Sequence, residues 1–169
     1  MPAATQDPSS PLRAPTLPRR FGALLYESIV LFGVLWSVAM IYGLAVGQRS
    51  GMMDRHGLQL AAFLALALYF IGFWSRAGQT VAMRAWHLRV IDQQGRPPCV
   101  WRAGLRFLLG WLWVLPPLAV AWWTGLDHAA GLALLAAWIV LWAFASLLRE
   151  DRQFWHDAWS GTRLVGTES

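Results

Sequence analysis

Charged residues are missing from four long stretches of the chain, which cover residues 28–48, 57–75, 107–126 and 128–148. Each stretch holds about 20 residues, and a helix of that length rises about 30 Å, the thickness of the hydrocarbon core of a bilayer. The pattern therefore predicts an all-α integral membrane protein with four transmembrane helices. The first helix is expected over about 24–47 and the other three over the remaining stretches.

The longest polar stretch between these helices, residues 76–106, contains a segment with a different periodicity. Apolar and polar side chains alternate along residues 86–92, which is typical of a β-strand rather than a helix. Residues 93–95, Gln-Gln-Gly, have the composition of a turn, and the prolines at 97 and 98 interrupt an immediate continuation. A short strand or hairpin segment is therefore predicted between the second and third helices.

The composition agrees with a membrane location. Hydrophobic residues make up 57% of the chain and charged residues 14%, whereas soluble domains contain about 25% charged residues. The 12 tryptophans suit the lipid–water interface, where an amphipathic ring is favourable. The single cysteine excludes an internal disulfide framework, and no His or Cys cluster at ligand spacing predicts a metal site.

All 14 basic residues are arginines, and their distribution predicts the orientation of the chain. The N-terminal tail, residues 76–106 and the C-terminus hold 12 of them, whereas the other two loops hold only Arg49 and Arg55. Short loops rich in arginine stay in the cytoplasm. We therefore expect both termini and the strand segment in the cytoplasm, in a multi-pass protein of the bacterial inner (cytoplasmic) membrane. This topology explains why the chain carries a formal charge of +5, so the charge does not indicate nucleic acid as a partner.

The ends of the chain differ from its centre. Residues 1–18 contain five prolines among Ser, Thr and Ala, a composition that cannot bury enough apolar surface to become ordered. The sequence predicts a disordered cytoplasmic tail over 1–18, one membrane domain over 19–165, and a short second tail over 166–169.

Two consecutive prolines, Pro116 and Pro117, lie near the middle of the third predicted helix. Each proline removes a backbone donor and clashes with the preceding turn. A bend in the third helix is therefore expected at this point.

Glu27 is the only acidic residue in the run from 21 to 46. An ionisable group at the centre of a transmembrane helix costs about 2.5–3.5 kcal/mol, so a compensating role is expected. Arg20 lies seven residues earlier, about 10.5 Å along the axis and on nearly the same helix face. Arg102 and Arg106, at the start of the third helix, are further candidate partners. Glu27 is either neutralised by an arginine to fix helix packing or part of a proton or cation site.

Three motifs follow one another along residues 19–165, and the first is Arg19-Arg20-Phe21 with the acid Glu27. The second is Gly78-Gln79-Thr80, followed by Met-Arg-Ala-Trp-His-Leu-Arg-Val at 83–90. The third is Asp-Arg-Gln-Phe-Trp-His-Asp at 151–157, followed by Gly161-Thr162-Arg163. In this combination the chain resembles the RDD family of membrane proteins. That family is named for an arginine at the start of the first helix, an aspartate within it and a later aspartate.

The resemblance assigns the family's named positions to residues of this chain. Arg20, or its neighbour Arg19, matches the arginine, and Asp157 matches the later aspartate. Glu27 stands where the first aspartate is expected; it retains the carboxylate and adds one methylene. The resemblance thus implies that Arg20, Glu27 and Asp157 form a charge cluster and a candidate proton or cation site. Glu27 is expected to have a basic partner that Asp157 shares, and Arg19, Arg102 and Arg106 are the supporting residues.

The resemblance also supplies functional hypotheses, because some members of the family have been linked to cation/proton antiport. The first hypothesis is a cation/proton antiporter or transport component that uses the cluster of arginine and acids. The alternative is a non-transporting membrane scaffold or assembly factor that binds lipid or a protein.

The expected partners follow from these hypotheses. They are the bilayer with its anionic headgroups, a monovalent cation, a proton and a further copy of the chain, because four helices hardly enclose a transport path alone. No cofactor is expected. His156 lies next to Asp157, but no activated Ser or Cys accompanies this pair, so we do not expect an enzyme.

Overall fold

The computed structural model of the chain describes residues 15–46, 55–145 and 155–167. The predicted disordered tail therefore falls largely outside the described residues. Within them the structure is mostly helical, and its elements in chain order are α1 (Leu17–Val46), α2 (Arg55–Ala77), α3 (Val81–Ala85), β1 (Leu88–Asp92), α4 (Val100–Gly110), the 3₁₀ helix η1 (Trp111–Trp113), α5 (Leu115–Thr124), α6 (His128–Ala145), α7 (Trp155–Trp159) and β2 (Thr162–Gly166).

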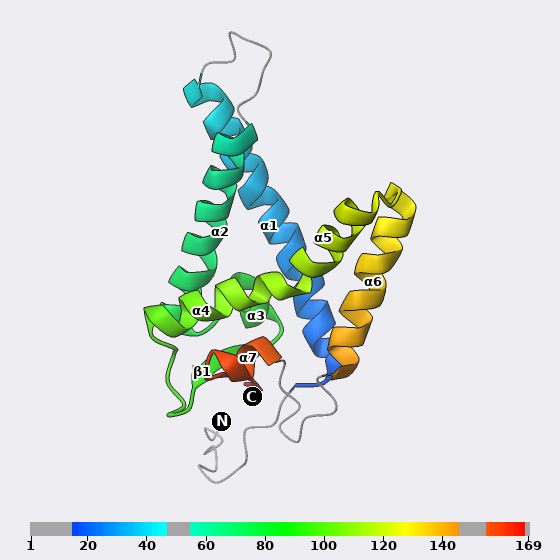
Figure 1. Cartoon of the computed structure of the whole chain (residues 1–169). Helices are drawn as coiled ribbons and strands as arrows, with labels where there is room; N and C mark the ends of the chain where they lie inside the picture. Colours follow the sequence, from blue (N-terminus) through cyan, green and yellow to red (C-terminus); the bar gives the residue numbers. More distant parts are fainter. Residues whose placement is uncertain (1–14, 47–54, 146–154, 168–169) are drawn as a thin grey trace.

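Four helical stretches are long and apolar enough to cross a membrane: Leu17–Val46, Arg55–Ala77, Val100–Thr124 and His128–Ala145. The prediction of four such stretches is confirmed. Large apolar side chains on the outside of these helices, such as Phe32 with 72% of its surface exposed, agree with a lipid environment. Figure 1 shows α1 paired with α2, and α5 paired with α6.

The third stretch is interrupted rather than continuous. Helix α4 ends at Gly110, a 3₁₀ turn follows, and α5 begins at Leu115. Pro116 and Pro117 occupy the first turn of α5, where a proline needs no intrahelical donor. The expected bend is confirmed, and the interruption begins before the prolines. In Figure 1, α4 runs crosswise below α2, and α5 then turns upward beside α6.

A hydrogen bond from the neighbouring helix compensates for the interruption. The Leu112 carbonyl would accept a hydrogen bond from residue 116 in a regular helix, but proline has no N–H. Instead, Nε1 of Trp138 on α6 donates to the Leu112 oxygen at 3.1 Å. The carbonyl that Pro116 leaves free is thus satisfied by a side chain.

The predicted strand is present, but its partner is not its neighbour in sequence. β1 pairs with β2 in antiparallel fashion, with Leu88 opposite Gly166 and Val90 opposite Leu164. The turn after β1 forms as predicted, because the Asp92 carboxylate accepts the backbone N–H groups of Gln94 and Arg96 at 2.8 and 2.9 Å. The chain then continues into α4 instead of returning beside β1. A local hairpin is therefore corrected to a two-stranded sheet that joins distant parts of the chain.

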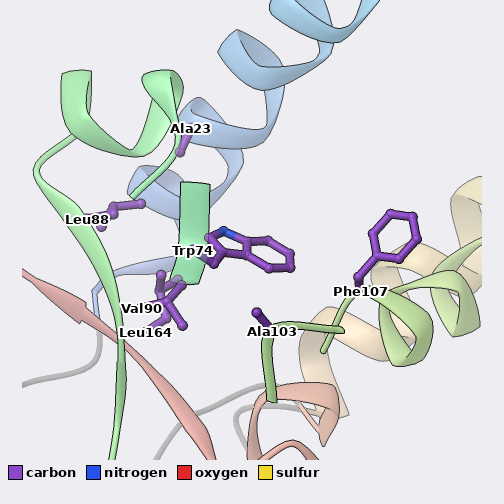
Figure 2. Close-up of a cluster of buried hydrophobic side chains, with 7 residues drawn as sticks. All are labelled: Ala23, Trp74, Leu88, Val90, Ala103, Phe107 and Leu164. Atoms are coloured by element: carbon purple, nitrogen blue, oxygen red, sulfur yellow. The ribbon is translucent and has the colours of Figure 1, made fainter. Parts of the chain in front are cut away.

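The buried apolar core lies where the helices meet this sheet, not between the long helices. It is formed by small and large apolar side chains from five elements (Figure 2): Ala23, Trp74, Leu88, Val90, Ala103, Phe107 and Leu164. We refer to residues 78–92 and 155–166, which contain α3, β1, α7 and β2, as the sheet end of the molecule. The sheet residues Leu88, Val90 and Leu164 are at most 5% exposed, whereas the long helices expose many large apolar side chains.

Candidate ion site and charge cluster

Helix α1 turns a narrow polar stripe toward the interior of the protein. Its buried residues are Arg20, Ala23 and Glu27, with exposed fractions of 3%, 6% and 6%. The spacing of three and four residues places all three on one face of the helix. Since α1 packs against α2 and α3, the Glu27 carboxylate is held inside the protein and does not face lipid.

Two hydroxyl groups from different elements bind the Glu27 carboxylate. Tyr69 on α2 donates its phenolic O–H to Oε1 at 2.7 Å. Thr80, which precedes α3, donates its Oγ1–H to Oε2. Thr80 is 1% exposed, and its oxygen also accepts the backbone N–H of Met83 at 3.2 Å, so that it caps α3. Both carboxylate oxygens are thus satisfied by neutral donors.

A basic partner for Glu27 was expected from the sequence, and this expectation is wrong for the part of the chain that the structure describes. There no arginine forms an ion pair with the Glu27 carboxylate. Arg20 lies two turns away on α1, and its Nε donates to the Pro15 carbonyl at 3.0 Å, toward the start of its own helix. Arg106 is held by another acid.

That other acid is Asp157, the second carboxylate of the predicted cluster. Asp157 is fully buried on α7, and its Oδ1 forms an ion pair with Nη1 of Arg106 on α4. The same Nη1 donates to Oγ1 of Thr162 at 3.0 Å, and the guanidinium carbon lies 4.9 Å from the centre of the Trp74 ring. The pair therefore links α7 and β2 to α4, with the guanidinium over an aromatic face.

A comparison with family models matches the RDD family over residues 14–161, which is most of the chain. This chain belongs to the RDD family. No curated protein and no solved structure matches it.

The residues at the RDD positions thus occupy two separate sites in the structure. Glu27 lies with Tyr69 and Thr80 between α1, α2 and α3, whereas Asp157 lies with Arg106 between α7 and α4. The two acids do not share Arg106, because Arg106 pairs with Asp157 while Tyr69 and Thr80 bind the Glu27 carboxylate. The wider cluster with Arg20 stays a prediction.

The supporting residues Arg19 and Arg102 contact different parts of this RDD protein. Arg19 donates from Nε to the Trp86 carbonyl at 3.0 Å and from Nη2 to the His87 carbonyl at 3.3 Å, and so attaches the start of α1 to the start of β1. Gly22, almost one turn further along, leaves the space that the Trp86 ring occupies. Arg102 is half-buried on α4, near Gly161.

Three residues of these sites were not predicted as site residues: Tyr69, Thr80 and Thr162. Thr80 and Thr162 stand inside the motifs that carry the resemblance to the RDD family, so a signal for them was present in the sequence. Tyr69 is a hydroxyl-bearing residue within the uncharged stretch 57–75, and its role as a partner of Glu27 depends on the packing of α1 against α2.

Proposed function

We propose that this RDD protein exchanges a proton for a monovalent cation at Glu27. The observation that supports this proposal is the environment of the carboxylate, which is buried and bonded to two neutral hydroxyl groups. A carboxylate paired with arginine has its charge cancelled permanently. The Glu27 carboxylate can instead be discharged by a proton or by a cation, and the two compete for the same oxygens.

The chemistry of the donors favours a small hard cation. A carboxylate and two hydroxyl oxygens converge from α1, α2 and the start of α3. Oxygen ligands suit hard cations, and a single negative charge matches a single positive one. Na⁺, Li⁺ and K⁺ are therefore the substrates to test. A further copy of the chain would help to enclose the path, because four membrane helices hardly enclose a transport path alone.

We further propose that the sheet end faces the cytoplasm of a bacterium, with both termini on that side of the inner membrane. The distribution of arginines supports this orientation, since Arg76, Arg84, Arg96 and Arg163 are exposed at or near that end. Exposed arginines at the membrane surface would also bind anionic lipid headgroups.

The test is flux through purified protein in sealed proteoliposomes with an imposed pH gradient. Addition of Na⁺, Li⁺ or K⁺ is expected to dissipate the gradient through the wild-type protein, and Glu27→Gln is expected to abolish this flux because its amide carries no exchangeable charge. The matched control is Asp127→Asn, at an acid whose side chain caps the start of α6. Asparagine caps a helix as well as aspartate does, so flux should be retained.

A folded wild-type protein that dissipates no gradient with any of the three cations would contradict the exchange proposal. The non-transporting scaffold would then be the better description. In that case, variants that disrupt the Arg106–Asp157 pair or the sheet end should abolish the binding of lipid or protein.

A further inference from the structure

Thr80 stands where the acid of α1 meets the sheet end. Its single hydroxyl group donates to the Glu27 carboxylate and accepts the N–H of Met83 at 3.2 Å. The residue is 1% exposed, so water does not replace either hydrogen-bond partner. The first turn of α3 and the candidate ion site therefore share one hydroxyl.

The two residues before Thr80 are bonded to β1. The Gly78 carbonyl accepts the N–H of Val90 at 2.7 Å, and the side-chain amide of Gln79 donates to the Leu88 carbonyl at 2.9 Å. Gly78 has a positive φ of 69°, and an added Cβ there would collide with the Val90 carbonyl oxygen. Residues 78–80 are therefore packed against β1 too closely to move independently of it.

β1 in turn holds the C-terminal strand. Leu88 and Val90 are buried in the core beside Leu164 of β2, as Figure 2 shows, and Val90 pairs with Leu164 in the sheet. A displacement of Thr80 would thus reach β2 through hydrogen bonds and a packed core.

We propose that Thr80 transmits the occupancy of Glu27 to the sheet end. This inference rests on the proposed cation exchange at Glu27. A hydroxyl group has one proton to donate and two lone pairs that accept. Without a cation, the Thr80 proton points at the Glu27 carboxylate. A cation on that carboxylate repels the proton and attracts the oxygen lone pairs, which also hold the N–H of Met83.

The consequence is a weaker cap on α3 when the cation is bound. Loss of an N-cap hydrogen bond corresponds to about a five-fold change in the local opening equilibrium. Because residues 78–79 are bonded to β1, the same change is expected in the opening of the β1–β2 pair. Tyr69 binds the same carboxylate from within α2, and its hydroxyl also accepts the backbone N–H of Val81 on α3.

The experiment measures amide hydrogen exchange of the full chain in lipid nanodiscs, with Na⁺ compared with N-methylglucamine at constant pH and ionic strength. In the wild-type protein, Na⁺ is expected to change exchange of residues 88–92 by about five-fold. Glu27→Gln should abolish this difference. Thr80→Val should also abolish it, whereas Thr80→Ser, which keeps the hydroxyl, should preserve it.

Thr124→Val is the matched control, because it makes the same substitution at a hydroxyl that donates to the Val120 carbonyl within α5. The Na⁺ difference at 88–92 should persist in that variant. If it persists equally in Thr80→Val, with exchange merely faster in both salts, Thr80 is only a structural cap and the inference is overturned. Loss of the difference in Thr124→Val as well as in Thr80→Val overturns it too.

A second variant keeps the test decisive if Thr80→Val does not fold. Gln79→Leu leaves both hydroxyls on Glu27 and removes a bond to the Leu88 carbonyl. Flux should be retained and the Na⁺ difference at 88–92 should shrink; an unchanged difference contradicts the coupling.

The two proposals fail separately. Flux without any Na⁺ difference in the wild-type sheet supports cation exchange and refutes transmission by Thr80. A Na⁺ difference that depends on Thr80 in a protein without flux supports transmission and refutes exchange across the membrane.

Discussion

Glu27 and Asp157 are both buried acids, yet the groups around them differ in charge. Asp157 faces the guanidinium of Arg106, whereas Glu27 faces the hydroxyls of Tyr69 and Thr80. A carboxylate opposite a fixed positive charge is suited to holding two elements together. A carboxylate among neutral donors is suited to changing its charge. The two acids that the family resemblance groups together thus divide into a structural site and a candidate exchange site.

The largest expected effect comes from breaking the Arg106–Asp157 pair. Arg106→Met removes the ion pair with the buried Asp157 carboxylate, and removal of one member of a buried pair costs about 3–5 kcal/mol. The free energy of unfolding, measured by SDS titration in mixed micelles, should fall by that amount. The double variant Arg106→Met with Asp157→Leu should recover much of the loss, because both charges of the pair are then replaced by apolar groups.

Arg163→Met is the control for this prediction, since Arg163 is exposed on β2. Its unfolding free energy should change by less than about 0.5 kcal/mol. An equal loss in Arg163→Met and Arg106→Met would show that the buried pair has no special part in stability, and the contrast between the two acids would then fail.

A smaller effect is expected from the hydroxyls around Glu27. Tyr69→Phe removes the hydrogen bond to Glu27 but keeps the ring, whose centre lies 5.2 Å from the ring centre of Phe70 and 4.9 Å from that of Phe73. A hydrogen bond to a charged group is worth about 1.5–3 kcal/mol, and one to a neutral group about 1 kcal/mol. If Glu27 is ionised, Tyr69→Phe should therefore cost more in the wild-type background than in Glu27→Gln.

The double-mutant cycle of these two substitutions measures the difference directly. A coupling energy near zero would mean that Tyr69 does not interact with the charge of Glu27. That result would remove the main physical argument for an exchange site among neutral hydroxyls.

The sequence was sufficient to predict features that depend on neighbouring residues. The four uncharged stretches, the alternation along 86–92 and the interruption near Pro116 each follow from local periodicity or from the chemistry of proline. The partner of β1 could not be predicted in this way, because β2 lies about 70 residues later and is short. A strand of five residues has too little pattern to identify its partner.

The partners of Glu27 were missed for a related reason. Distance along one helix made Arg20 the natural candidate, whereas the actual donors come from α2 and from the residue before α3. Arg106 was a plausible partner by charge, but its position on the inner face of α4 directs it to Asp157. Charge and periodicity indicate which residues need partners, and only packing determines which partners they receive.

The smallest predicted effect concerns the helices away from both acids. Trp138→Phe removes the hydrogen bond to the Leu112 carbonyl that Pro116 leaves free, and it retains an aromatic ring beside Trp142, whose ring centre lies 5.8 Å from that of Trp138. Hydrogen bonds between membrane helices contribute about 0.6 kcal/mol on average and at most about 1.7. The unfolding free energy should decrease by an amount within that range. Cation flux should be unchanged, because the described hydroxyls on Glu27 come from α2 and from the residue before α3, not from α6.

Since Pro116→Ala restores an N–H for the same carbonyl, Trp138→Phe should cost less in that background. An equal cost in both backgrounds would show that the tryptophan does not compensate for the proline. A loss of flux in Trp138→Phe would mean that α5 and α6 take part in exchange, and the functional contrast would then extend beyond the two acids.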